Sequence, residues 1–272
     1  ATLDRVYVAQ GGMCHVLDAA TGETRAEFAM PARDPAARKP QPLPWGYIGV
    51  YGDRLIGGGD FVEFTDVLGL GQEDAAPWRV LDKAAGRKLV VMDRHSGAIQ
   101  WQKDAVHGFL HNGIVAGNDT LFCLDKLPPA IEDQLARRGK KAPRDYRLLA
   151  LDIATGESRW EESKNVFGSF LCYAEKEDVL IQSTRPSRDS GPGESGTRMI
   201  AYRGKDGRVL WDRKVAYRTF PVIHGRRILT ESGAFDLMTG EALHRVDPIT
   251  RETQPWTWER QYGCNYPIAS EN

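Results

Sequence analysis

The sequence has little excess charge of either sign. Its 272 residues include 36 Lys and Arg and 37 Asp and Glu, which give a formal net charge of −1 at pH 7. Nucleic acids and anionic membranes are bound by surfaces with a large cationic excess, so this balance argues against a broad surface of either kind. We therefore expect no nucleic-acid partner, although a local basic patch is compatible with these numbers.

Long hydrophobic runs are also absent. No segment approaches the ~18–20 continuous apolar residues of a membrane-spanning helix, so we expect no transmembrane segment. No export signal is visible at the start, where "ATLDRVYVAQ" already has the pattern of a strand. The hydrophobic content of 41% is enough for a sizeable core in a chain of this length, which predicts a globular fold.

Cysteine is scarce, and no two cysteines form a CxxC pair. The sequence therefore gives no support to a zinc knuckle or a thioredoxin-type motif. Each cysteine lies in an apolar, strand-like run, which favours buried free thiols, with one disulfide pair as the alternative. The four residues are Cys14, Cys123, Cys172 and Cys264.

The sequence contains a repeated turn. Five copies align on a glycine, and in four of them an Asp lies four residues earlier. Glycine adopts positive φ readily, and short polar side chains bond nearby backbone N–H groups, so these residues predict a tight turn. The glycines are Gly22, Gly97, Gly156, Gly207 and Gly240, and the Asp residues are Asp18, Asp93, Asp152 and Asp236.

The strand after the turn carries a tryptophan in three copies. Trp101, Trp160 and Trp211 each lie four residues beyond the glycine, and Ala26 and His244 occupy this place in the outer copies. A large flat side chain at a fixed place in each repeat can pack between neighbouring sheets. We therefore interpret the recurring Asp, Gly and Trp residues as structural and not as catalytic.

Two more strand-like segments precede the hairpin in the later repeats, for example 108–117 and 120–125. Each repeat then has four strands, named a to d in chain order, and four-stranded antiparallel units in tandem predict an all-β propeller. We expect a single domain over 1–272 with about five visible blades. Their approximate ranges are 3–30, 44–104, 106–163, 165–215 and 217–248, with a partial last strand at 259–272.

The two ends of the chain leave the size of the ring open. The first repeat begins at its strand b (5–10), and 259–272 has the pattern of a strand a. Residues 262–270 either complete the first sheet and close a five-bladed ring, or the chain is a fragment of a larger ring. We favour the larger ring.

Insertions accumulate between strands b and c. In a propeller these loops share one face with the links from strand d to the next strand a, and the glycine turns lie on the opposite face. The inserts therefore predict one elaborated face, called here the insert-bearing face. They cover 60–87, 126–146 and 185–197.

The second insert is predicted to contain a short helix over about 129–138. Pro129 suits the first turn of a helix, and Ile131 and Leu135 make one apolar stripe. The helix runs into the basic cluster "RRGKK" (137–141). We interpret this cluster as a solvated surface, with contact to an anion or a partner as the alternative.

The segment "ALDIATGESRW" (150–160) resembles the repeat of the pyrroloquinoline-quinone-type β-propellers, with its Asp, Thr-Gly and tryptophan. The segments "VMDRHSGAIQW" (91–101) and "AYRGKDGRVLW" (201–211) are similar to it. That family includes quinoprotein alcohol dehydrogenases and the propeller lipoprotein of outer-membrane protein assembly, and "YGCNYPIASEN" (262–272) resembles a stretch of uncharacterised bacterial members. The resemblance implies a periplasmic or otherwise extracytoplasmic location.

The resemblance also implies a cofactor to be considered. Dehydrogenases of this family bind pyrroloquinoline quinone with a calcium ion held by Glu, Asn and Asp, and many cap it with adjacent cysteines. This sequence has no Cys-Cys pair and no CxxCH haem motif. We therefore predict no cofactor and keep pyrroloquinoline quinone with Ca²⁺ as the alternative.

Ligands of propellers generally meet the mouth of the central channel, where the links from strand d reach the next strand a. An aromatic or His residue precedes a glycine at four of these places, and such a ring can line a small-ligand site. The alternative is that the glycines allow close strand packing and the aromatics fill the space between blades. The candidates are Trp45, His107, His111, Phe167, Arg218, His224, Tyr262 and Asn265.

The histidines do not predict a metal site. His107 and His111 are four apart on one strand, which places them on one face but roughly 13 Å apart at ~3.3 Å per residue. We predict a non-catalytic scaffold that binds a protein, glycan or small ligand on the insert-bearing face. The alternative is a quinoprotein alcohol dehydrogenase-like enzyme, and a third hypothesis is a hydrolase or lyase that uses channel residues such as His107 and His224.

Overall fold

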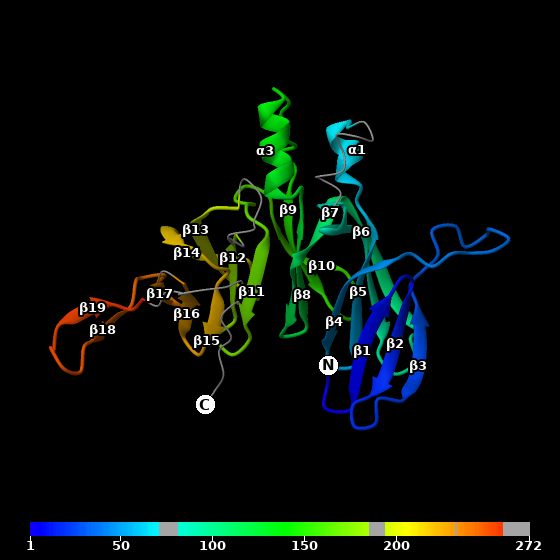
Figure 1. The fold of residues 1–272 in the computed structure, drawn as a ribbon, viewed down its shortest axis with the longest axis horizontal. Helices are drawn as coiled ribbons and strands as arrows, with labels where there is room; N and C mark the ends of the chain where they lie inside the picture. The colour runs from blue at the N-terminus through cyan, green and yellow to red at the C-terminus, as the bar shows by residue number, and fades with distance from the viewer. Residues whose placement is uncertain (71–80, 185–193, 232, 258–272) are drawn as a thin grey trace. The chain divides into compact units, whose positions relative to one another are not determined.

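Short antiparallel strands joined by tight turns make up most of residues 1–70, 81–184, 194–231 and 233–257, the part of the chain that the computed structural model describes (Figure 1). Runs of four to nine apolar-rich residues bounded by Gly, Asp and Thr favour strands of this length over helices. The all-β prediction is confirmed.

The first blade has three described strands in the order β1-β2-β3, all antiparallel to their neighbours. They are β1 (Arg5–Gln10), β2 (Met13–Asp18) and β3 (Thr24–Ala29). They correspond to strands b, c and d of the predicted repeat.

The second and third blades share one strand. Strand β7 (Ile99–Gly117) is 19 residues long, so it supplies strand d to one blade and continues as strand a of the next. A sheet with the order β10-β9-β8-β7-β6-β5-β4 results, where the sequence predicted a break at about 105. The other strands are β4 (Trp45–Tyr51), β5 (Arg54–Phe61), β6 (Ala85–Asp93), β8 (Thr120–Asp125), β9 (Arg147–Asp152) and β10 (Ser158–Glu162).

Helical segments occur only in the inserts of these two blades, as far as the described residues show. Between β5 and β6 lie helix α1 (Phe64–Leu68) and the 3₁₀ turn η2 (Leu81–Lys83). Between β8 and β9 lies helix α3 (Pro129–Arg137). None of the described helices is long and apolar enough to span a membrane.

The fourth blade is a four-stranded sheet in the order β11-β12-β13-β14, followed by a three-stranded sheet in the order β15-β16-β17 and a separate hairpin, β18-β19. The residue ranges are β11 (Phe170–Ala174), β12 (Val179–Ser183), β13 (Gly196–Arg203), β14 (Val209–Tyr217), β15 (Val222–His224), β16 (Arg227–Thr230), β17 (Gly233–Asp236), β18 (His244–Val246) and β19 (Thr253–Pro255).

The chain forms two compact units, each with its own apolar core. The first comprises Ala1–His111, Leu124–Pro128 and Leu151–Glu157, and the second comprises Asn112–Cys123, Pro129–Ala150 and Ser158–Asn272. Cys14, Phe28, Trp45 and Met92 belong to a core of the first, and Ile181, Met199, Trp211 and Ile228 to a core of the second. Cys14, Cys123 and Cys172 are free thiols, in line with our interpretation of them, and Cys264 lies outside the described residues.

The glycine turns are closed by one recurring set of hydrogen bonds. At Gly156, whose φ is +75°, the Asp152 N–H donates to the Glu157 carbonyl and the Gly156 N–H donates to the Asp152 carbonyl, both at 2.8 Å. The Asp152 carboxylate accepts from the Thr155 N–H at 3.1 Å, and the Thr155 hydroxyl accepts from the Glu157 N–H at 3.2 Å. The backbone pair recurs at Gly22, Gly97, Gly207 and Gly240.

An aromatic side chain from one blade lies on the turn glycine of the following blade. A Cβ added to Gly156 would lie 2.7 Å from the indole of Trp101, whose Nε1–H donates to the Ile153 carbonyl at 2.9 Å. The other pairs are Trp160 with Gly207, Trp211 with Gly240 and Phe28 with Gly97. The repeat therefore needs glycine for two reasons, positive φ and close contact with a ring.

Phe28 was not anticipated. The repeat alignment places Ala26 at the tryptophan position of the first copy, yet Phe28, two residues further along β3, lies on Gly97. Residues two apart on a strand point to the same face, so the ring reaches the turn from the next inward-facing position.

Alanine substitutions at Gly156 and Gly22 distinguish the requirement for positive φ from the requirement for close contact with a ring. Nothing lies within 4 Å of a Cβ added to Gly22, whereas Gly156 contacts the Trp101 ring. We expect Gly22→Ala to lower the free energy of unfolding by about 1 kcal/mol from positive φ alone. Gly156→Ala should cost about 2–4 kcal/mol, because overpacking adds to the backbone term. Urea unfolding of both variants measures the difference, and equal losses would contradict the ring contact.

A sixth turn of the same kind joins β18 to β19 and escapes the glycine alignment. The Asp247 N–H donates to the Glu252 carbonyl at 2.9 Å, and the Arg251 N–H donates to the Asp247 carbonyl at 3.0 Å. Asp247 Oδ1 accepts from the N–H groups of Thr250 and Ile249, which lowers the pKa of that carboxyl. Arg251 stands where the other copies have glycine, with a φ of +62°.

Arg251→Gly is expected to stabilise this hairpin. A non-glycine residue in the left-handed region costs about 1–2 kcal/mol, and part of that gain is offset by the greater entropy of glycine in the unfolded chain. We expect slower amide hydrogen exchange at Asp247 and Glu252, corresponding to about 0.5–1 kcal/mol. Arg251→Ala, which keeps the strain, is the control and should leave the exchange rates unchanged.

Candidate functional site

The start of strand a in the third blade is held by a buried carboxylate. Asp125, the last residue of β8, is fully buried and accepts hydrogen bonds from the N–H groups of Val106, His107 and Gly108 at 2.9, 2.8 and 3.0 Å. Three charge-assisted bonds compensate for much of the cost of burying this charge. Sequence reasoning missed Asp125, although a single carboxylate closing the apolar run "TLFCLD" was a visible signal.

His111 is partly buried within the first unit. Its ring meets Phe61 edge to face, with centroids 6.0 Å apart, and it covers Gly46, where a Cβ would collide with it. Nε2 is buried without a hydrogen-bond partner. Burial lowers the pKa of His111 to about 4, so the imidazole is neutral near pH 7.

Trp45 is part of a core of the first unit. It is 7% exposed, its ring lies on Gly57 of β5, and its Nε1–H donates to the Gly12 carbonyl at 3.2 Å. Gly57 permits this close approach, since a Cβ there would come within 2.7 Å of the indole. The glycine run of β5 thus serves packing in the second blade.

Phe167 lies under a guanidinium in the fourth blade. The Cζ of Arg198 is 5.0 Å from the centre of the Phe167 ring, within the range of a cation–π contact. Arg198 also donates two hydrogen bonds to the carboxylate of Asp212, at 2.8 and 2.6 Å, and they lower the pKa of Asp212. Both the ring and the cation are therefore engaged by neighbouring strands.

Gln182 performs in the fourth blade the task that Asp125 performs in the third. It is fully buried, and its Nε2–H groups donate to the carbonyls of Asn165 and Phe167 at 3.1 and 2.9 Å. The Tyr202 hydroxyl donates to Gln182 Oε1 at 3.3 Å. Side chains from strand b again fix the segment that leads into strand a, and sequence reasoning missed this residue too.

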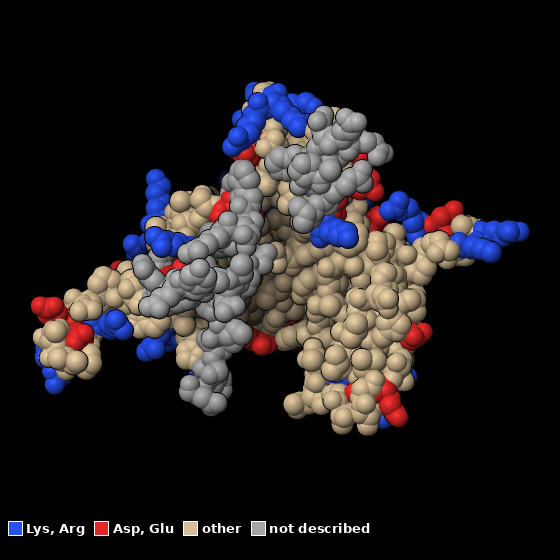
Figure 2. Space-filling view, in the orientation of Figure 1, with Lys and Arg blue, Asp and Glu red and all other residues tan. Residues whose placement is uncertain are grey.

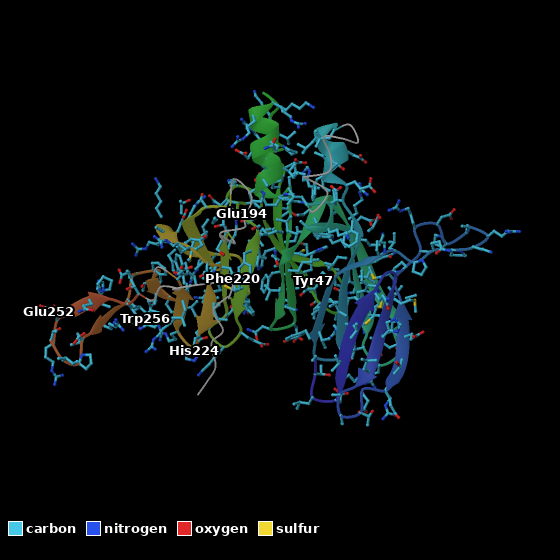
Figure 3. The ribbon with its side chains drawn as sticks, in the orientation of Figure 1. Tyr47, Glu194, Phe220, His224, Glu252 and Trp256 are labelled. Atoms are coloured by element: carbon cyan, nitrogen blue, oxygen red, sulfur yellow. The ribbon has the colours of Figure 1, made fainter. Side chains whose placement is uncertain are left out.

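The fifth blade separates two of the predicted site residues. Arg218 is exposed in the link before β15, close in sequence to Phe220, which stacks on Phe170 with centroids 5.0 Å apart. His224 is the last residue of β15 and lies at the other end of that strand (Figure 3). The structure therefore does not bring His224 together with Arg218. Tyr262 and Asn265 lie outside the described residues.

Helix α3 is anchored to its unit by an apolar stripe. Pro129, Ala130, Ile131 and Leu135 are all buried, which confirms the predicted helix and its stripe. The chain leaves the helix through Gly139, whose φ is +68°, and the Lys140 N–H donates to the Leu135 carbonyl at 2.8 Å. This is a Schellman-type end, which fixes the direction of the following loop.

The free end of α3 carries a concentration of positive charge, called here the cationic tip (Figure 2). Its side chains are all exposed within residues 137–144. Arg137 donates to the carboxylate of Asp133 one turn earlier, at 2.7 Å. The members of the tip are Arg137, Arg138, Lys140, Lys141 and Arg144.

The described residues assign no site to calcium with pyrroloquinoline quinone. They contain no group of three or more His, Cys, Asp or Glu side chains placed to hold a metal ion. Calcium takes six to eight oxygen ligands, usually including several carboxylates. The buried carboxylate of Asp125 is committed to three backbone donors instead. We therefore derive no chemical step through this cofactor.

Four-stranded antiparallel blades with an Asp-Thr-Gly turn and a ring on the turn glycine define a propeller of the pyrroloquinoline-quinone type. The family model described as "Outer membrane protein assembly factor BamB" matches residues 77–252, well over half of the chain. The chain belongs to this family. No curated protein matches it significantly in sequence.

Solved structures similar to this chain include BamB, a dehydrogenase and a designed protein. BamB from Moraxella catarrhalis has a TM-score of 0.52 at 14% identity, with 89% of this chain and 58% of that chain covered. A europium-containing methanol dehydrogenase has 0.53 at 11%, covering 95% and 50%, and the computationally designed Ika8 protein has 0.53 at 9%, covering 89% and 58%. These identities support the fold alone, and the chain spans between 50% and 58% of the length of these structures.

Proposed function

We propose that this protein is a non-catalytic scaffold that binds a partner protein through the inserts between strands b and c. The observation that carries the proposal is the construction of α3. Its apolar stripe is buried and its end is capped, while Ala136 and the tip are exposed. A rigid projecting element of this kind loses little conformational entropy on binding.

The starts of strands a support the same proposal. His107 and Phe167 contact their own blades through backbone and ring, and the Trp45 indole donates to the Gly12 carbonyl of the first blade. These groups already have partners within the protein and so stabilise the fold. The inserts are therefore the surfaces available to a partner. Membership of a family described as an outer membrane protein assembly factor also favours a binding role and an extracytoplasmic location.

Site-specific photo-crosslinking tests the proposal in cells that produce the chain. A photoreactive residue at Ala136, exposed on α3, is expected to give discrete adducts with another protein. The matched position is Lys205, which is exposed in the turn between β13 and β14 and should give none. Adducts from Lys205 alone, or from neither position, would refute the proposal. So would a purified chain that retains pyrroloquinoline quinone stoichiometrically with Ca²⁺ and oxidises alcohols.

A further inference from the structure

The positive charge of the cationic tip indicates the chemical class of the partner. This inference rests on the proposed function. We propose that the tip of α3 binds an acidic segment of a partner protein. The whole chain has a formal net charge of −1, so the concentration of cations within 137–144 is local. In the described part of the chain, no carboxylate pairs with Lys140, Lys141 or Arg144.

Stabilisation of helix α3 does not account for the positive charge of the cationic tip. A cation in the last turn stabilises a helix by interacting with its carbonyl end, and Arg137 is placed there. Lys140, Lys141 and Arg144 follow the capped end at Gly139 and lie beyond the last helical turn. Unpaired cations held close together repel one another, and an acidic ligand relieves this repulsion.

The geometry favours a protein over a membrane surface. A helix that lies on a membrane buries an exposed apolar face among the lipids. Here Ile131 and Leu135 are 0% and 5% exposed, so the apolar stripe of α3 is already used. Among described residues, no large apolar side chain between 129 and 146 is exposed. What remains is a set of exposed positive charges within residues 137–144, which suits acidic side chains on a polypeptide.

The test is binding of a fluorescent oligoglutamate peptide to the whole chain at low ionic strength. The variant K140E/K141E/R144E should bind about tenfold more weakly than the parent chain, because the local field is reversed. The matched control is K176E/K205E/R208E, which makes the same charge change at exposed turns of the same unit. It should change the dissociation constant less than twofold, and far-UV circular dichroism should show both variants folded.

Other outcomes overturn the inference. Equal losses in the two variants would mean that the peptide follows net charge alone, and no loss in the tip variant would mean that it binds elsewhere. Tip-dependent binding of phosphatidylglycerol vesicles in place of the peptide would assign the tip to lipid. If Ala136 still gives its crosslinked adduct in K140E/K141E/R144E, the scaffold function stands and only the acidic partner is refuted.

Discussion

Trp211→Ala should lower the stability of the fourth and fifth blades by about 3–5 kcal/mol, the usual cost of truncating a large buried aromatic residue. The indole is 7% exposed, lies on Gly240 and donates to the Leu237 carbonyl at 2.9 Å. Its loss removes one of the contacts that join β14 to the turn at Gly240, where Arg213 also donates to the Thr239 carbonyl. Native-state hydrogen exchange at Ile228 and Phe235, both buried in the fifth blade, measures the effect.

Two further variants test whether the effect of Trp211→Ala comes from the loss of the ring contact. Trp211→Phe keeps most of the apolar contact and loses the hydrogen bond, so it should cost about 1–2 kcal/mol. Lys214→Ala, exposed on the same strand, should stay within about 0.5 kcal/mol of the parent chain. A loss below about 1 kcal/mol for Trp211→Ala would show that the ring contact contributes little.

Acidification should destabilise the first unit through His111. In the unfolded chain the imidazole takes up a proton below about pH 6.5, but in the folded chain only below about pH 4. The unfolded state therefore binds more protons between these values, and the free energy of unfolding falls as pH falls across this window. The shift corresponds to about 3 kcal/mol, lost fully below pH 4.

His111→Asn tests this assignment, because asparagine keeps a side-chain donor and does not titrate. Urea unfolding at pH 7 and pH 4.5 should show a clearly smaller loss of stability in His111→Asn than in the parent chain. The matched control is His244→Asn, which removes an exposed histidine. The prediction fails if His111→Asn retains the parent's full dependence. Tyr47, whose Cβ lies beside Gly58, has a phenol whose pKa is raised by burial, so it does not titrate in this range.

Sequence reasoning predicted the elements that depend on local chemistry. The turn glycines need positive φ, and the strands need apolar runs, so both are visible in a single sequence. Helix α3 was found for the same reason, since its apolar spacing and Pro129 are local signals. The sixth turn was missed because Arg251 takes the glycine position, and only the backbone shows that its conformation is the same.

The predicted mouth depended on relations that a single sequence does not contain. Whether the Trp45 ring faces a channel or a core depends on its position over Gly57. That position is set by the register of β4 and β5. The prediction grouped His224 with Arg218 because both lie near one strand. Arg218 precedes that strand, whereas His224 is its last residue. Asp125 and Gln182 were overlooked because their partners are backbone groups distant in sequence.

The ring-on-glycine contacts run in one direction along the chain, and this has a consequence during synthesis. Each aromatic residue leaves the ribosome before the glycine that will receive it, as with Trp160 and Gly207. At about 5–20 residues per second, the interval is roughly 2–10 seconds. A nascent blade thus presents a bare indole until its successor emerges, and during that interval it is open to capture by chaperones or by another unfinished chain.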